Sequence, residues 1–214
     1  MSTNGSVRRR RGAAAREEAL DAARDLLLSG GPAAVTLKAV GERMGVGHAN
    51  LIHHFGSAAG LQGALMDRMV RDLADQIDRG LGPTRDAIEP GRLMDVVFDA
   101  FGKGGASQLA AWLVLAGEQA RAESLAGIVR DLADRLEGLS PDDVHARARA
   151  RALVTAAAYL AFANGLIGDV LKPMLGAPDG LGRELALKLT ASIIADTDFS
   201  GSPEKTPTPA PRDA

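Results

Sequence analysis

The stretch TLKAVGERMGVGHANLIHHFGSAAGL, residues 36–61, decides the fold of the N-terminal part of this 214-residue chain. Thr36 is a residue type that is typical of a helix N-cap. Gly41 and Gly45 lie four residues apart and Leu51 follows six residues later, which is the spacing of a helix-turn-helix. Gly41 allows two helices to approach closely, Gly45 permits a positive φ in the turn, and Leu51 packs the second helix onto the first. We therefore expect two short helices joined by a tight turn.

Outside this stretch the apolar residues recur at helical spacing, and no period-2 run is long enough to predict a strand. A helix from about Ala14 to Ser29 is expected to end at Gly30-Gly31-Pro32, and a long helix is expected from Ser57 to about Leu81. The fold class predicted is all-α, an N-terminal three-helix helix-turn-helix domain followed by a C-terminal helical bundle. Further helices are predicted after Pro90, around Trp112, over about 125–136, from about Asp142 to Leu171, and over 181–193.

The composition places the chain among globular proteins, with 46% apolar and 24% charged residues. The absence of cysteine excludes disulfides, thiolate metal ligands and cysteine nucleophiles, and it fits a cytoplasmic location. No apolar run approaches the roughly 18–20 residues of a membrane span, so no membrane partner is expected. The basic N-terminus lacks the apolar segment of a secretory signal.

The formal net charge of −2 hides an uneven distribution of charge. Residues 8–60 contain eight Lys and Arg against five Asp and Glu, a net +3, whereas residues 61–214 carry a net −5. A basic N-terminal part on an acidic remainder is typical of a DNA-binding domain that is fused to a separate sensing domain. The two ends of the chain are not expected to belong to a folded domain. Residues 1–13 are predicted to be a basic disordered arm, and residues 198–214 a disordered Pro-rich tail.

Residues from about 16 to 70 resemble the DNA-binding region of the TetR family of transcriptional regulators. The resemblance implies that residues 14–60 are the helix-turn-helix DNA-binding domain and that residues 61–197 form a helical ligand-binding and dimerisation domain. It also implies a homodimeric, ligand-responsive regulator, a repressor that a small-molecule effector releases from palindromic double-stranded DNA. The matching residues are Thr36-Leu37-Lys38-Ala39-Val40, Gly45-Val46, Leu51, His54-Phe55, Ser57 and Leu61.

The second helix of the motif, about Gly47 to His53, is expected to enter the major groove. His48 and Asn50 are the candidates for base contact, because an Asn amide can bond adenine in a bidentate manner. The alternative is that Asn50 is a solvated surface residue or a local cap. The expected DNA-binding residues are Arg8, Arg9, Arg10, Arg11, Thr36, Lys38, Gly47, His48, Ala49, Asn50, His53 and His54.

Three positions depart from the family pattern. The family usually has Ser at Gly47, Tyr at Ile52 and Lys at Ala58. The Tyr and Lys commonly contact DNA phosphates, so two positioning contacts are missing here. The run Arg8–Arg11 is a candidate replacement that tracks the backbone or the minor groove, and its alternative is a solubilising tail.

For the remaining helices, the resemblance implies an effector pocket and a dimer interface. A mainly apolar effector is expected from the large polarizable side chains, with Trp112 and Tyr159 as the preferred contacts because they also have polar groups. The alternatives are that the ligand candidates form ordinary core and that the dimer candidates are buried within one chain. The ligand candidates are Met94, Phe98, Phe101, Trp112, Tyr159 and Phe162, and the dimer candidates are Ala157, Ala161, Leu185, Leu189 and Ile193.

An enzyme and a protein-binding adaptor are the two alternatives to a transcriptional regulator. An enzyme is not expected, because the sequence has no GxSxG elbow, no HExxH and no P-loop. No cofactor is expected, and no metal site, because the spacing of His48, His53 and His54 does not match a helical metal-binding pair. A helical protein-binding adaptor with a degenerate DNA-binding head remains the alternative, since the Tyr and Lys contacts are missing.

Overall fold

The computed structural model of the protein describes residues 3–80, 89–118, 123–140 and 142–196, and within these ranges it contains helices and no strand. The predicted all-α class is confirmed, whereas the predicted Pro-rich tail lies outside the described residues. The helices in chain order are α1 (Thr3–Gly30), η1 (Pro32–Ala34), α2 (Leu37–Met44), α3 (His48–Phe55), α4 (Ala58–Gly80), α5 (Pro90–Phe101), α6 (Ala106–Leu115), α7 (Glu123–Gly138), α8 (Ala146–Leu175) and α9 (Leu181–Ala195).

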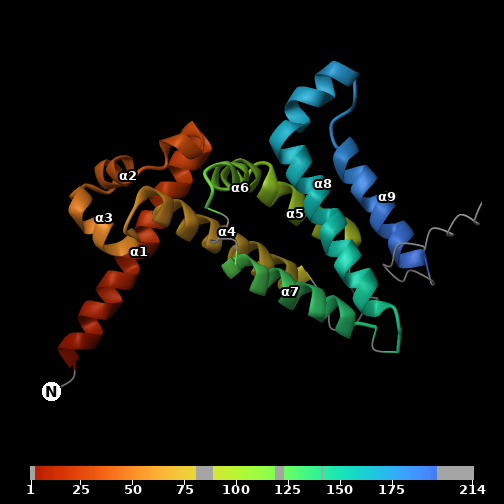
Figure 1. Ribbon diagram of the computed structural model, residues 1–214, viewed down its shortest axis with the longest axis horizontal. Coiled ribbons are helices and arrows are strands. Elements are labelled where there is room, and N and C mark those ends of the chain that lie inside the picture. The colour runs from red at the N-terminus through yellow and green to blue at the C-terminus, as the bar shows by residue number, and fades with distance from the viewer. Residues whose placement is uncertain (1–2, 81–88, 119–122, 141, 197–214) are drawn as a thin grey trace, which may run out of the picture.

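Helix α1 starts earlier in the chain than the helix predicted from about Ala14, and the first two residues of the predicted arm lie outside the described residues. The helix begins at Thr3 instead of near Ala14, so the run Arg8–Arg11 is part of it. Arg and Ala have high helix propensity, and no proline interrupts the chain before Pro32. Figure 1 shows the N-terminal half of α1, in red, projecting away from the other helices.

We call residues 12–69 the head. Large aliphatic side chains from α1, the segment before α2, and α2 to α4 fill its core. Three residues of α6 belong to the same cluster, and Leu109 of that helix has no exposed surface. The predicted domain boundary after residue 60 stays a prediction, but the apolar core continues across it into α4 and α6. Seven of these aliphatic side chains are at most 1% exposed: Leu20, Leu27, Val35, Val40, Leu51, Leu61 and Leu65.

We call residues 90–196 the body, in which α8 packs against α5, α6, α7 and α9 (Figure 1). The body has its own buried cluster, separate from that of the head, which consists of Met94, Phe98, Ala161 and Ala186. Small residues bring the helices together, since a Cβ at Gly165 of α8 would lie only 2.6 Å from the Phe101 carbonyl oxygen of α5. The body is therefore held by close backbone approach more than by large buried side chains.

Helix α8 is long and apolar enough to span a membrane by length and composition alone, with a mean hydropathy of 1.5 over 18 residues. This corrects the expectation that no segment approaches such a span. Only 11% of that window is buried within the chain. An apolar helix of a folded body that remains so exposed is typical of a surface that another chain covers.

Candidate nucleic-acid interface

Helices α2 and α3 and the turn between them form the predicted helix-turn-helix. Thr36 has extended backbone angles, and its Oγ1 accepts a hydrogen bond from the Ala39 N–H at 3.1 Å, as an N-cap does. Gly45 ends α2 in the left-handed conformation with φ 69°. Both predictions for these residues are confirmed.

The close approach predicted at Gly41 is also present. A Cβ at this position would lie 2.9 Å from the Val46 carbonyl oxygen and 3.5 Å from Leu51 Cδ1. Leu51 itself is 1% exposed. Because its side chain is locked in the head core, Leu51 fixes which face of α3 points to solvent.

The solvent face of α3 and the residue before it contain several of the predicted DNA contacts. Helix α3 starts at His48 and ends at Phe55, close to the predicted span. Gly47 precedes it as an N-cap with no side-chain hydrogen bond, which is the consequence of Gly in place of Ser. The exposed residues are Gly47, His48, Ala49, Asn50, Ile52 and His53, while His54 is half-buried.

The remaining predicted contacts lie on α1 and at the start of α2. Lys38 projects into solvent and pairs with Glu42 across one turn, with Nζ and Oε1 3.8 Å apart. Thr36 is half-buried by its capping role, and its hydroxyl proton remains available as a donor. Arg8–Arg11 lies on the projecting part of α1, beyond the helix-turn-helix core (Figure 1).

Gln62 is a positioning residue that the sequence analysis missed. Its side chain is 7% exposed, and Nε2 donates to the Val35 carbonyl at 3.1 Å and to the Pro32 carbonyl at 3.3 Å. These bonds attach the segment before α2 to α4. A buried glutamine within an amphipathic run is the signal that could have found it, because a buried amide requires partners.

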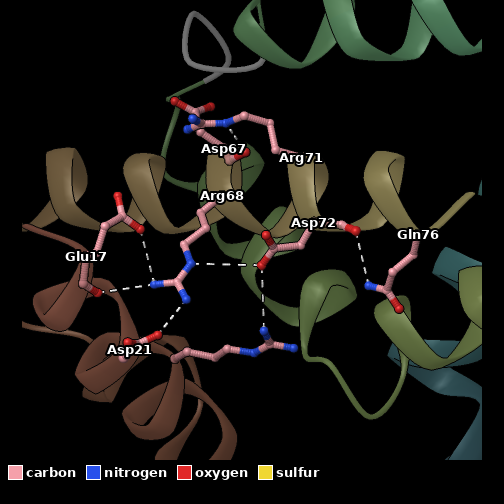
Figure 2. A network of polar contacts seen from close by, with 8 residues as sticks. Glu17, Asp21, Asp67, Arg68, Arg71, Asp72 and Gln76 are labelled. Atoms are coloured by element: carbon pink, nitrogen blue, oxygen red, sulfur yellow. Dashed lines mark hydrogen bonds and ion pairs between the residues drawn. The ribbon is translucent and has the colours of Figure 1, made fainter. Parts of the chain in front are cut away.

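A network of charged side chains braces α1 against α4, as Figure 2 shows. Arg68 of α4 lies between Glu17 and Asp21 of α1, with Nη2 2.5 Å from Asp21 Oδ1, and it also donates to the Glu17 carbonyl at 3.2 Å. Asp72 extends the network to Arg24, 3.8 Å away. Exposed pairs of this kind contribute little stability, on the order of 0–1 kcal/mol each, so their main effect is to orient the two helices.

Residues 19–65 match the family model of bacterial regulatory proteins of the tetR family. The N-terminal domain is a tetR-family domain. The match spans the second half of α1, the helix-turn-helix and the start of α4, so the resemblance seen in the sequence is confirmed. A search of curated proteins found no relative that matches the chain.

Solved structures extend the likeness beyond the tetR-family domain. A transcriptional regulator from Rhodococcus sp. RHA1 matches with a TM-score of 0.61 and 18% identity, covering 84% of this chain and 95% of that one. The multidrug binding protein EbrR, solved with imidazole, matches with a TM-score of 0.55 and 17% identity, covering 83% and 93%. At these identities the likeness shows the fold alone, and it covers about five sixths of the chain, most of the body included.

The structure brings four of the six predicted ligand residues together. Met94 and Phe98 are buried in the body core, 6% and 2% exposed, and Phe101 packs against this cluster. The rings of Phe101 and Phe162 meet edge to face with centroids 6.5 Å apart. The two preferred contacts do not belong to this cluster and face solvent, with Trp112 42% exposed and Tyr159 73% exposed.

The dimer candidates divide in the same way. Leu185 and Leu189 of α9 are about half exposed, and Ile193 is half-buried. Ala161 has no exposed surface, and Ala157 packs against the same core cluster, which fits the alternative of burial within one chain. The small Ala161 side chain serves packing inside its own chain. The larger exposed residues of α8 were not among the predicted dimer contacts; they include Leu166, Ile167, Val170, Leu171, Met174 and Leu175.

Proposed function

We propose that this chain is a cytoplasmic, homodimeric transcriptional repressor that a small-molecule effector releases from palindromic DNA. The observation that carries the proposal is the tetR-family helix-turn-helix, whose second helix, α3, presents exposed polar residues and is anchored in a buried apolar core. In such motifs the N-terminal residues of the second helix contact base edges. His48 and Asn50 have this position in α3.

Selection of random duplex DNA by the full chain tests the proposal. Enrichment of a palindrome is the expected result, because two copies of one head read half-sites about 34 Å apart. A protein-binding adaptor would enrich no sequence, and that result would reject the repressor.

The Asn50→Ala variant tests base reading directly. The lost bidentate contact should weaken binding to the selected site by about 1–3 kcal/mol and relax the preference at one base position. Asn164→Ala, which changes the same residue type in the body, is the matched control and should bind the site as the parent does. Unchanged specificity in Asn50→Ala would show that this residue is only a surface residue.

The exposed apolar face of α8 and α9 supports the homodimer. Leu185 and Leu189 lie on α9, which packs against α8, and most of the large exposed apolar residues of α8 lie between Leu166 and Leu175. If two copies paired through these helices, they would form a four-helix interface about a two-fold axis. Sedimentation at micromolar concentration is expected to give a dimer. Leu189→Asp should give a monomer, whereas a monomeric parent would exclude this arrangement.

The apolar cluster at Phe98, Phe101 and Phe162 supports an effector site in the body. Such side chains with a few polar groups are the usual lining of small-molecule sites. The EbrR structure, described as a multidrug binding protein complexed with imidazole, has the same fold. An effector that favours one separation of the two heads would shift the population away from the DNA-bound form, with α4 joining head to body. Titration of the DNA complex with apolar compounds should release DNA, and binding without release would exclude this role.

Arg8–Arg11 would add phosphate contacts from the projecting part of α1. A chain that lacks residues 1–12 is expected to bind DNA more weakly in gel shifts at low salt. Equal affinity with and without these residues would show that the run is a solubilising segment.

A further inference from the structure

Arg16 is the one cation of residues 12–60 that has no ion-pair partner among the residues the structure describes. The other three, Arg24, Lys38 and Arg43, each pair with a carboxylate. The Arg16 guanidinium instead lies 5.3 Å from the ring centroid of Phe55, the last residue of α3. A cation–π contact holds a guanidinium in place while leaving its N–H groups free to bind an anion.

Arg16 lines a notch where α1, the end of α3 and the start of α4 meet. The notch has a volume of about 330 Å³ and is shallow and open to solvent. His54 of α3 and Asp67 of α4 also line the notch. Arg16 therefore borders a space large enough for a phosphate group, with one carboxylate in the same wall. The other lining residues are Phe55, Gly60, Gly63 and Ala64.

The notch lies at the end of α3 that does not read bases. An eight-residue helix rises by about 1.5 Å per residue, so Phe55 is roughly 10 Å from His48 along the axis. The major groove is about 12 Å wide. When the N-terminal end of α3 contacts base edges, its C-terminal end therefore lies near the phosphates that border the groove.

We propose that Arg16, held over Phe55, binds a backbone phosphate of the operator at this notch, with His54 as its neighbour. The proposal rests on the proposed DNA-binding function. It supplies a positioning contact at the same end of α3 as Ile52 and Ala58, where the family's Tyr and Lys contacts are missing. Asp67 opposes an anion, so the phosphate would meet the Arg16 side of the notch.

The salt dependence of DNA binding tests this contact, with the full chain and the duplex that it selects. Each neutralised phosphate contributes about 0.9 to the slope of log K against log salt. Arg16→Gln is expected to make the slope shallower by about 0.9, and Arg16→Lys should keep it because the charge remains. Arg24→Gln removes the same charge from the same helix, from a residue paired with Asp72, and should leave the slope unchanged. Asp67→Asn should tighten binding severalfold.

The outcomes separate this proposal from the function on which it rests. If the parent enriches a palindrome but Arg16→Gln keeps the parent's slope, the Arg16 contact is wrong and the repressor stands. A second result would also reject the Arg16 contact: Arg16→Gln binds DNA more weakly and melts at a lower temperature, but its slope of log K against log salt equals that of the parent. Arg16 would then only hold Phe55 in place. If the parent enriches no DNA, both proposals fail.

Discussion

The head and the body use different kinds of packing. The head buries seven Leu and Val side chains almost completely, drawn from α1, the segment before α2, and α2 to α4. The body's own cluster contains two large buried side chains, Met94 and Phe98, beside alanines. Its larger apolar residues on α8 and α9 remain exposed, Met174 and Leu175 at 75% each. The head therefore has a core that holds a reading helix at one angle, while the body leaves apolar surface for a second copy.

The largest expected effect comes from removing a head core side chain. Leu51→Ala should lower the free energy of unfolding by about 2–5 kcal/mol, because it leaves a cavity under α3. Leu189→Ala removes the same atoms from a half-exposed site of the body and should change monomer stability by less than about 0.5 kcal/mol. Urea unfolding of both variants at a concentration where the parent is monomeric checks the contrast. Equal losses would show that the two regions are packed alike.

Replacing a closely packed glycine by alanine should lower the free energy of unfolding by a similar amount in the head and in the body. Gly41→Ala places a Cβ 2.9 Å from the Val46 oxygen, and Gly165→Ala places one 2.6 Å from the Phe101 oxygen. Overpacking of this kind costs about 1–3 kcal/mol. Gly127→Ala in α7 meets nothing within 4 Å and should instead add about 0.5–1 kcal/mol. Thermal melting that ranks Gly41→Ala with Gly127→Ala would contradict the close contact of α2 with α3.

Removing the buried side-chain amide of Gln62 in the head should lower the free energy of unfolding by about 1–3 kcal/mol. Gln62→Ala leaves the Val35 carbonyl without its side-chain donor and should lower stability by that amount. Gln76→Ala lies on the exposed face of the same helix and should change stability by less than about 0.5 kcal/mol. Denaturation of the pair checks whether the buried amide matters, and a silent Gln62→Ala would remove it as a positioning residue.

The smallest expected effect is a pH dependence at an exposed pair of the body. The Lys188 ammonium, 2.6 Å from Glu184 Oε1, lowers the pKa of Glu184 below its ordinary value of 4.5. A depressed pKa means that the pair stabilises the fold above pH 4.5 and loses this effect as the pH falls through the lower folded value. Lys188→Gln should remove this part of the pH dependence of melting. Because both groups are exposed, 1 M salt should suppress the difference, and a difference that persists in salt would show another cause.

Local patterns predicted the head better than the body. The cap at Thr36, the left-handed turn at Gly45 and the burial of Leu51 depend on neighbours within about fifteen residues, so the spacing of the residues carries the information. Helix α1 begins at Thr3, earlier than the Gly and Ala residues near position 14 predict, because the Arg residues before them also favour a helix. Gln62 was missed since its partners are about 30 residues away.

Periodicity alone does not decide which side of a body helix faces inward. Ala161 was expected at an interface and is fully buried, while Tyr159 was expected at a ligand and is 73% exposed. Tyr159 and Ala161 are two positions apart on α8, so their side chains point about 200° apart around the helix, to nearly opposite faces. Both faces of α8 are apolar, so composition does not show which face is buried. Which face is buried depends on where α5 and α9 pack.

The amino-acid sequence by itself determined the all-α class, the helix-turn-helix and its tetR-family character, because caps, turns and short-range packing are encoded by adjacent residues. Only the tertiary structure decided that α6 completes the head core, that Gln62 holds the segment before α2, and that Arg16 lies over Phe55. These contacts join residues that are distant in the chain. Their geometry is set by how whole helices pack, and no local pattern reports it.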